Sequence, residues 1–247
     1  MVVDPIGTRL RVVNSVKTVV IADDHPLFRT ALREALKPVV PGARVIEADS
    51  FPALQNALHQ HGAPDLVLLD LVMPGVRGFS SLLFMRAEYP TVPVVVVSGY
   101  EEAALVQRVL QFGALGFIPK SASLETMGEA VQTALAGKVW TPPEVPKTDD
   151  SGADAELAQK VASLSPQQLR VLLMLADGRL NKQIAHELAI TEATVKAHMT
   201  VILRKLGLVR RTQAAVLAQR LMQEEALPLA VDHIMDEDPP EEESPAA

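Results

Sequence analysis

Four apolar runs of this chain are each followed closely by a residue type that can handle phosphate. The pair Asp23-Asp24 follows the first run, Asp70 the second, Ser98 the third and Lys120 the fourth. Three carboxylates at one place cannot all stay ionised and unpaired, and a hard divalent cation such as Mg²⁺ would neutralise them. Beside that cation, Asp70 could attack a phosphoryl group as a nucleophile, while Lys120 and Ser98 hold the phosphoryl oxygens. The spacing therefore predicts a phosphate-handling pocket.

The apolar runs are short, continuous and rich in β-branched residues, as in the buried strands of a parallel sheet. Stretches with helical period lie between them, so strand and helix alternate about five times. Right-handed crossovers bring the carboxyl ends of parallel strands to one edge, where open α/β sheets place their ligands. We therefore expect a doubly wound, five-stranded parallel α/β sheet that gathers the polar residues at that edge. The runs are Thr18 to Ala22, Leu66 to Leu69, Val94 to Val97 and Gly116 to Ile118.

Composition limits the class of protein. The chain has 247 residues, of which 48% are hydrophobic, enough for one or two domains with a sizeable core. It has no cysteine, which excludes disulfides and thiolate chemistry, and residues 1–16 lack the basic start and apolar core of a secretion signal. Its apolar runs all fall short of the ~20 residues that a membrane-spanning helix needs. We therefore expect a cytoplasmic protein that does not enter a membrane.

The net charge of −7 hides an uneven distribution. Residues 160–220 carry +7, whereas residues 221–247 carry −9. Prolines among acidic residues between Thr141 and Glu156 indicate an exposed linker. The predicted organisation is a first domain at 17–137, a linker at 138–159, a basic domain at 160–222 and an acidic, disordered tail at 223–247.

The basic domain has apolar positions at helical spacing in four short blocks, which indicates an all-α, four-helix unit. Ser165, Pro166 and Gln168 have the pattern of a capping box, so one helix is expected to start there. Thr191 is a suitable cap for a helix over residues 192–206. A short helix joined tightly to that segment suggests a helix-turn-helix, whose second helix enters the DNA major groove. The expected buried face of this second helix is Val195, Met199, Ile202 and Leu206.

The first domain contains four motifs, which are Val19-Val20-Ile21-Ala22-Asp23-Asp24-His25, Asp70-Leu71-Val72-Met73-Pro74 with Gly78, Val97-Ser98-Gly99 and Gly116-Phe117-Ile118-Pro119-Lys120. Together they resemble the receiver domain of bacterial two-component response regulators, a flavodoxin-like fold. The resemblance covers roughly residues 17–137.

The resemblance implies a role for each polar residue of the pocket. It implies that Asp70 accepts the phosphoryl group and that Ser98 and Lys120 contact it. It further implies a switch role for Phe117, which would turn inward when Ser98 moves toward the phosphate. The implied Mg²⁺ ligands are Asp24, Asp70 and the backbone carbonyl of Val72, with Asp23 acting mainly through a metal-bound water.

The basic domain has motifs of its own, which are Leu164-Ser165-Pro166, Asn181-Lys182-Gln183-Ile184-Ala185, Thr194-Val195-Lys196-Ala197-His198, Leu203-Arg204-Lys205-Leu206-Gly207 and Arg211-Thr212-Gln213-Ala214. They resemble the LuxR-type DNA-binding domain, and a receiver followed by this domain defines the NarL/FixJ class. The resemblance implies base readout by Lys196, Ala197 and Thr200. It implies phosphate contacts by Lys182, Thr194, His198, Arg204 and Lys205. Ala189 departs from the family pattern, which usually has glycine in this turn.

The sequence thus predicts a transcription factor and not an enzyme. A histidine kinase would phosphorylate Asp70, and the switched protein would bind double-stranded DNA, as a homodimer when active. One alternative is a constitutive DNA-binding regulator whose receiver serves only as an interaction module. Another is a magnesium-dependent phosphatase of the haloacid dehalogenase type, but such enzymes typically need a second Asp where this chain has Val72.

Overall fold

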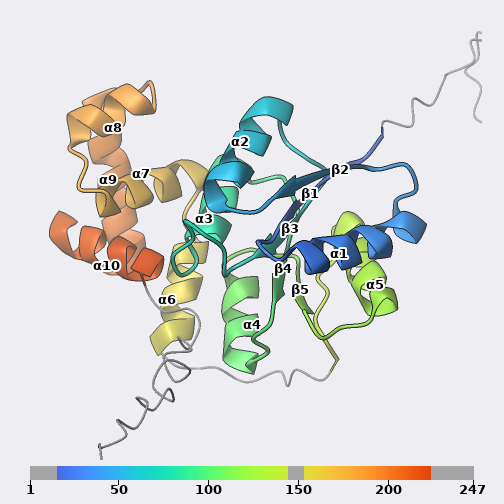
Figure 1. Ribbon diagram of the computed structural model, residues 1–247. Helices are drawn as coiled ribbons and strands as arrows, with labels where there is room; N and C mark the ends of the chain where they lie inside the picture. The colour runs from blue at the N-terminus through green and yellow to red at the C-terminus, as the bar shows by residue number, and fades with distance from the viewer. Residues whose placement is uncertain (1–15, 144–152, 224–247) are drawn as a thin grey trace, which may run out of the picture.

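The computed structural model describes residues 16–143 and 153–223, which form two domains (Figure 1). The first domain contains a five-stranded, wholly parallel sheet with the strand order β2-β1-β3-β4-β5. This order places β1, β3 and β4 inside the sheet, so their carboxyl ends lie next to one another. The strands are β1 (Thr18–Ala22), β2 (Arg44–Ala48), β3 (Leu66–Asp70), β4 (Val94–Ser98) and β5 (Gly116–Pro119).

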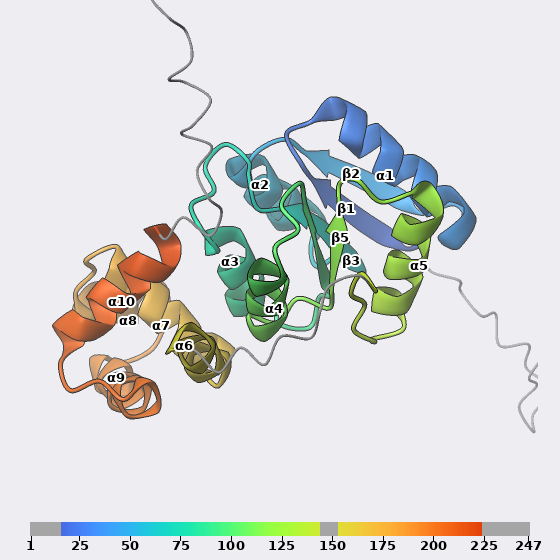
Figure 2. The same cartoon turned by 90° about the horizontal axis from the view of Figure 1, so that it is seen from below.

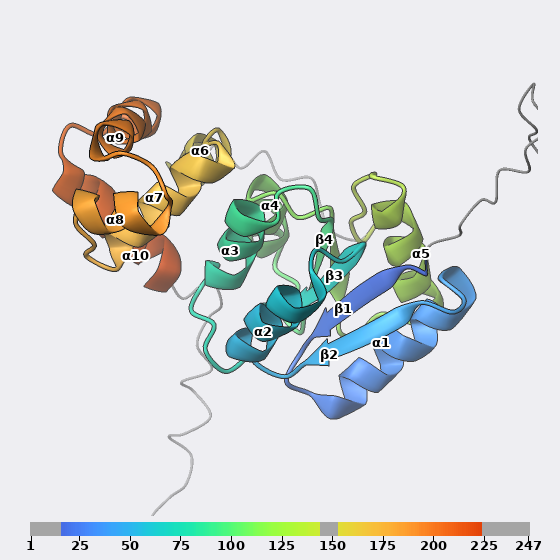
Figure 3. The same cartoon turned by 90° about the horizontal axis from the view of Figure 1, so that it is seen from above.

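Two helical layers cover the sheet, and alternate residues of each strand face one layer or the other. Val19 and Ile21 pack with α1 and α5, while Val20 and Ala22 face the core beneath α2, α3 and α4. Figures 2 and 3 show the two layers on opposite faces of the sheet. The predicted doubly wound α/β fold is confirmed. The helices are α1 (Pro26–Val39), α2 (Phe51–His61), α3 (Ser80–Glu88), α4 (Ala103–Gln111) and α5 (Leu124–Leu135).

The edge strand β2 is absent from the apolar runs that predicted the other four strands. It contains the charged residues Arg44 and Glu47, and only Ala48 in it is buried. An edge strand with one partner does not need the continuous apolar run of a central strand, which explains the missing signal. Its pairing with β1 runs from Thr18 opposite Arg44 to Ala22 opposite Ala48.

The second domain, called the effector domain below, comprises residues 153–223. Ser165 and Gln168 form the predicted capping box at the start of α7, and Thr191 caps α9 through the amide of Thr194. The predicted second helix over residues 192–206 and its buried face are both observed. Its helices are α6 (Ala153–Ala162), α7 (Pro166–Ala176), α8 (Asn181–Glu187), α9 (Glu192–Leu206) and α10 (Arg211–Gln223).

Both ends of the predicted linker at 138–159 are structured. Trp140 forms a bridge to Gly116 beside β5, so the chain still packs on the receiver fold after residue 137. Helix α6 begins at Ala153, and its residues Ala158 and Val161 are buried. Helix α6 packs against the neighbouring helices α4 and α9. Composition alone does not reveal this tertiary packing, so the helix was not predicted. The central part of the linker and most of the predicted acidic tail lie outside the described residues.

One apolar core continues from the first domain into the effector domain. Helix α3 contacts α7, and α4 contacts α6, so the two domains pack against each other directly. Helix α9 lies on the side of the effector domain away from the sheet (Figures 2 and 3). Within the described ranges, no helix is both long enough and apolar enough to span a bilayer.

Candidate functional site

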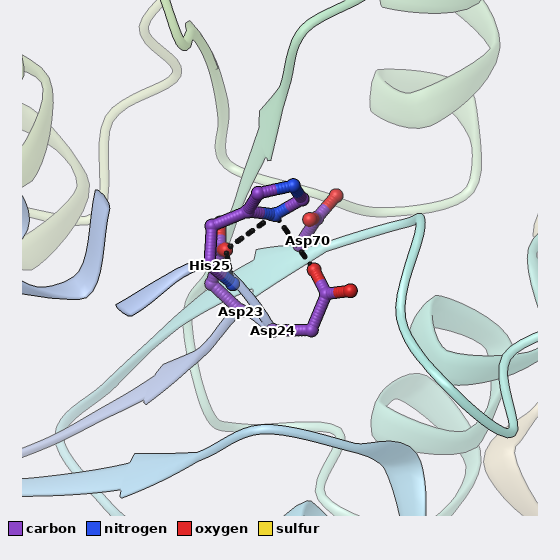
Figure 4. A group of neighbouring side chains, drawn as sticks. All are labelled: Asp23, Asp24, His25 and Asp70. Atoms are coloured by element: carbon purple, nitrogen blue, oxygen red, sulfur yellow. Dashed lines mark hydrogen bonds and ion pairs between the residues drawn. The ribbon is translucent and has the colours of Figure 1, made fainter. Parts of the chain in front are cut away.

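Three carboxylates and one imidazole meet at the carboxyl edge of the sheet (Figure 4). Asp23 and Asp24 follow β1, His25 follows them directly, and Asp70 ends β3. Each of the four offers one ligand atom, and these atoms all lie within 4.8 Å of one another. The side chains of Asp23 and Asp70 are only 1% exposed. The predicted convergence of the acidic residues is therefore present.

Lys120 is the cation that holds two of these carboxylates. Its Nζ lies 2.8 Å from Asp23 Oδ2 and 2.7 Å from Asp70 Oδ2. Its backbone amide donates to the carbonyl of Ser98 at 2.7 Å, and its Nζ stands 5.1 Å from the centre of the Phe28 ring. Burial alone would lower the pKa of Lys120, but its close pairing with Asp23 and Asp70 raises that pKa overall. Lys120 therefore stays charged beside the carboxylates.

Burial raises the pKa of Asp70, the carboxyl group at the centre of the site. The hydrogen bond from Lys120 and the bond of 2.9 Å from the Val72 amide to Oδ1 oppose this rise, and the charge of Asp23 adds to it. An ionised Asp70 is therefore under-compensated in this pocket. Such a carboxylate gains from any further positive charge or hydrogen-bond donor.

The pocket has the donor set that a hard divalent cation requires. Asp23 Oδ2 and Asp24 Oδ1 are buried and accept no hydrogen bond of good geometry, although Lys120 and His25 lie within 2.8 Å of them. Carboxylate oxygens that are clustered and incompletely satisfied fit Mg²⁺, which prefers oxygen ligands. The Val72 amide is bonded to Asp70, which keeps this residue at the rim of the site where its carbonyl is expected to act.

Ser98 and Phe117 lie on the strands beside Asp70. Ser98 ends β4 and is fully buried, and its hydroxyl accepts the amide of Tyr100 at 3.1 Å. Phe117 is fully buried in β5 opposite Val96. The Phe117 ring is thus already packed inward. The Ser98 hydroxyl oxygen accepts a hydrogen bond from the loop that leads into α4.

His25 belongs to this cluster although no role was predicted for it from the sequence. Its Nδ1 lies 2.7 Å from Asp24 Oδ1 and 3.4 Å from Lys120 Nζ, and its amide donates to Asp23 Oδ1 at 2.7 Å. Its position directly after two metal-type carboxylates is the signal that could have included it.

The predicted DNA-contacting residues lie on α8 and α9 and differ in exposure. Five of them are exposed, namely Lys182, Lys196, Ala197, Thr200 and Arg204. Thr194 and His198 are partly buried, and the Thr194 hydroxyl pairs with that of Thr191 at 2.9 Å. Lys205 differs from the other basic residues because its Nζ binds the carbonyl of Ser163 at 2.7 Å and Gln168 Oε1 at 3.0 Å.

The turn between α8 and α9 contains a strained residue. Ala189 has a φ of 52°, the only positive φ of a non-glycine residue in the described part of the chain. Glycine adopts this left-handed conformation without strain, whereas a Cβ costs about 1–2 kcal/mol in it. The short turn places α8 and α9 as the helix-turn-helix requires.

Comparison with known families agrees with this two-part structure. Residues 19–132 match the family model described as "Response regulator receiver domain". Residues 162–218 match the model described as "Bacterial regulatory proteins, luxR family". A receiver joined to a LuxR-type helix-turn-helix domain defines a two-component response regulator that controls transcription.

Individual relatives extend this match to most of the chain. The glycerol metabolism activator of Pseudomonas putida is 40% identical over 210 residues, which cover 81% of this chain and 94% of that protein. The nitrate/nitrite response regulator protein NarL of Escherichia coli K12 is 34% identical over 206 residues, 81% of this chain and 93% of that protein. This chain belongs to the response regulators with a LuxR-type DNA-binding domain.

Solved structures to which this chain is similar include RcsB from Salmonella enterica serovar Typhimurium, bound to a promoter in the presence of the phosphomimetic BeF₃⁻. It is 24% identical, with a TM-score of 0.47, over 81% of this chain and 96% of that chain.

Proposed function

We propose that Asp70 accepts a phosphoryl group from a histidine kinase or a small phosphodonor and that this modification controls DNA binding. The observation that carries the proposal is the position of Asp70 at the carboxyl end of β3, buried and bonded to Lys120, with Asp23 and Asp24 beside it. This arrangement presents a nucleophilic carboxylate, a fixed cation and a set of metal-type oxygens in one pocket.

The transfer forms one bond and breaks one bond. A carboxylate oxygen of Asp70 attacks phosphorus, the new O–P bond forms, and the bond to the donor's leaving group breaks. With acetyl phosphate the leaving group is acetate, and with a phosphohistidine donor it is the imidazole nitrogen. Lys120, held between Asp23 and Asp70, is placed to pair with a phosphoryl oxygen as charge develops on it.

Asp23, Asp24, Asp70 and the carbonyl of Val72 would hold Mg²⁺ in this pocket. When bound, Mg²⁺ neutralises the carboxylates and the incoming phosphoryl oxygens. Lys120 and the Val72 amide keep Asp70 oriented at the edge of the sheet. Ser98 donates its hydroxyl hydrogen to the phosphoryl group, which is compatible with its role as acceptor from the Tyr100 amide, and Phe117 is the switch residue that supports the movement of Ser98.

The output is binding of double-stranded DNA by α8 and α9. Lys196, Ala197 and Thr200 of α9 face the bases, and Lys182 of α8 and Arg204 of α9 face the phosphates. The phosphorylated protein acts as a homodimer in the cytoplasm, where bacterial DNA is found. It acts as a regulator and not as a phosphatase, since Val72 offers no general acid at the second position after Asp70.

The test is phosphorylation of the full chain with acetyl phosphate, followed by intact-mass measurement and peptide mapping. The wild type is expected to gain one phosphoryl group on Asp70 in Mg²⁺ and almost none in EDTA. Asp70→Asn is expected to gain none, while Asp65→Asn, which changes a carboxylate at the opposite end of the same strand, is expected to react like the wild type. Modification of Asp70→Asn to the wild-type extent would refute the assignment.

A further inference from the structure

Arg86 of the receiver binds the end of the first effector helix. Its guanidinium donates to the carbonyls of Val161, Ala162 and Leu164, the last two at the junction of α6 and α7. Carbonyls at a helix C-terminus have no partner within the helix, so a cation from outside can satisfy them. Residues 161–165, called the α6–α7 turn below, are thus held by a side chain of α3.

A second arginine makes the reciprocal contact. Arg170 of α7 donates to the carbonyl of Ala87 at 3.1 Å and pairs with Glu88 at 2.8 Å, at the C-terminus of α3. Each domain therefore supplies an arginine to the last turn of a helix in the other domain. Both contacts break if the domains separate, because their partners belong to different domains.

The α6–α7 turn also binds α9, the second helix of the helix-turn-helix, called the recognition helix below. Lys205, near the end of α9, donates to the carbonyl of Ser163 at 2.7 Å and to Gln168 Oε1 at 3.0 Å. Four carbonyls between residues 161 and 164 are thereby bonded to a receiver arginine or to a recognition-helix lysine. The same Gln168 oxygen accepts the amide of Ser165 in the capping box, so Lys205 is tied to the start of α7 as well.

We propose that the α6–α7 turn couples receiver docking to the DNA contacts of α9, with Arg86 keeping Lys205 bound to the turn. In the docked state Lys205 is occupied by Ser163 and Gln168. When the domains separate, the turn loses Arg86 and the packing of α4 on α6, and Lys205 becomes available to a DNA phosphate. This inference rests on the proposed DNA binding and adds to it a regulated contact.

The basic residues of α9 differ in their exposure in the docked state. Lys196 and Arg204 are exposed in the docked state, whereas Lys205 is partly buried and bonded. Docking therefore does not cover the helix as a whole but withholds one cation from it. Each lysine that reaches a phosphate adds about 0.9 to the slope of log K against log salt, so one withheld contact is measurable.

The experiment measures this slope for the full-length unphosphorylated chain on a double-stranded oligonucleotide of mixed sequence, by fluorescence anisotropy. The proteins are wild type, Arg86→Ala, Lys205→Ala and the double variant. Arg86→Ala is expected to steepen the slope by about 1, although it removes a positive charge. Lys205→Ala is expected to reduce the slope by about 1 more in the Arg86→Ala background than in the wild-type background.

Three controls separate the possible causes. Arg77→Ala removes an exposed arginine just before α3 and is expected to leave the slope as in the wild type. Arg170→Ala breaks the reciprocal contact from the effector side and is expected to steepen the slope as Arg86→Ala does, which guards against a folding defect of one variant. Lys196→Ala is expected to reduce the slope equally in both backgrounds.

Two results would overturn the coupling. If Arg86→Ala and Arg170→Ala leave the slope unchanged while Lys196→Ala reduces it, DNA binding stands and the coupling is wrong. If the steeper slope of Arg86→Ala persists in the double variant, Lys205 is not the released group. If none of the proteins binds DNA at low salt, either unphosphorylated or after treatment with acetyl phosphate and Mg²⁺, the proposed function itself fails.

Discussion

In the receiver, buried carboxylates at the carboxyl edge of the sheet lower folding stability through electrostatics. In the effector domain, the backbone conformation of one residue lowers it. In the receiver, Asp23 and Asp70 are buried around a single lysine, and burial raises the pKa of Asp70. In the effector domain, Ala189 adopts a left-handed conformation in an otherwise well-capped helical unit. Both features belong to the elements that carry function, as expected where local rules are broken.

The two ends of β3 show the same contrast within one domain. Asp65, just before the strand, accepts the amide of Thr18 at 2.8 Å and pairs with Lys17 at 2.7 Å. The hydrogen bond from Lys17 holds the pKa of Asp65 below its usual value. Asp65 thus stabilises the fold, whereas the buried and under-compensated Asp70 fits the proposed phosphoryl ligand. A site optimised for stability would have no need of further charge.

The largest effect is expected from removing the lysine that pairs with the carboxylate at each end of β3, Lys120 with Asp70 and Lys17 with Asp65. Lys120→Met leaves two carboxylates that are 1% exposed without their cation and is expected to lower the free energy of unfolding by about 3 kcal/mol. Lys17→Met removes a pair whose side chains are 50% and 32% exposed and is expected to cost no more than about 1 kcal/mol. Urea denaturation in EDTA measures both variants, and equal losses of unfolding free energy would contradict the expected difference between the two ends of β3.

Replacing Asp70 and Asp65 by asparagine is expected to change the free energy of unfolding in opposite directions. At neutral pH without metal, Asp70→Asn is expected to raise the free energy of unfolding because it removes a buried, under-compensated charge. Asp65→Asn is expected to lower it by about 1 kcal/mol through its weakened hydrogen bonds. Denaturant titrations of the two variants against wild type provide the measurement, and destabilisation by Asp70→Asn would contradict this view of the site.

The pH dependence of folding stability follows from the shifted pKa values of Asp70 and Asp65. Because the pKa of Asp70 is raised on folding, the folded state takes up its proton first as the pH falls toward the unfolded value of about 3.9. The advantage of Asp70→Asn is therefore expected to shrink as the pH is lowered from 7 toward 4. The contribution of Asp65, whose pKa is lowered, is expected to persist to about pH 4 and to be lost below it. An advantage of Asp70→Asn that grows with acidity would contradict the sign.

The smallest effect is expected in the effector domain. Ala189→Gly relieves the left-handed conformation and is expected to raise the free energy of unfolding by about 1 kcal/mol. Ala197→Gly, at an exposed position inside α9, is expected to lower it by about 1 kcal/mol. Thermal unfolding of the two variants measures the contrast, and a loss of stability in both would show that Ala189 is not strained.

Local signals account for the parts of the molecule that the sequence predicted. Helix α9 was predicted with its bounds because Thr191 caps its start and Gly207, with a φ of 69°, ends it. The meeting of Asp23, Asp24, Asp70 and Lys120 followed from the geometry of a parallel sheet. These features depend on short stretches of sequence or on a rule of topology.

The contacts that were not predicted join segments distant in the chain. Helix α6 is buried only through its packing on other helices, and Arg86 meets its end across more than 70 residues of sequence. Lys205 was expected to contact DNA phosphate, but a pattern of basic residues does not reveal that a carbonyl of another helix binds one of them. Tertiary partners of this kind have no local signature.

The most direct test of the account measures binding to genomic DNA fragments with and without acetyl phosphate and Mg²⁺, for wild type, Asp70→Asn and Asp65→Asn. If phosphorylation of Asp70 controls DNA binding, the phosphodonor strengthens binding of wild type and Asp65→Asn and has no effect on Asp70→Asn. Equal binding by all three proteins in both conditions would contradict it and would favour a constitutive DNA-binding regulator.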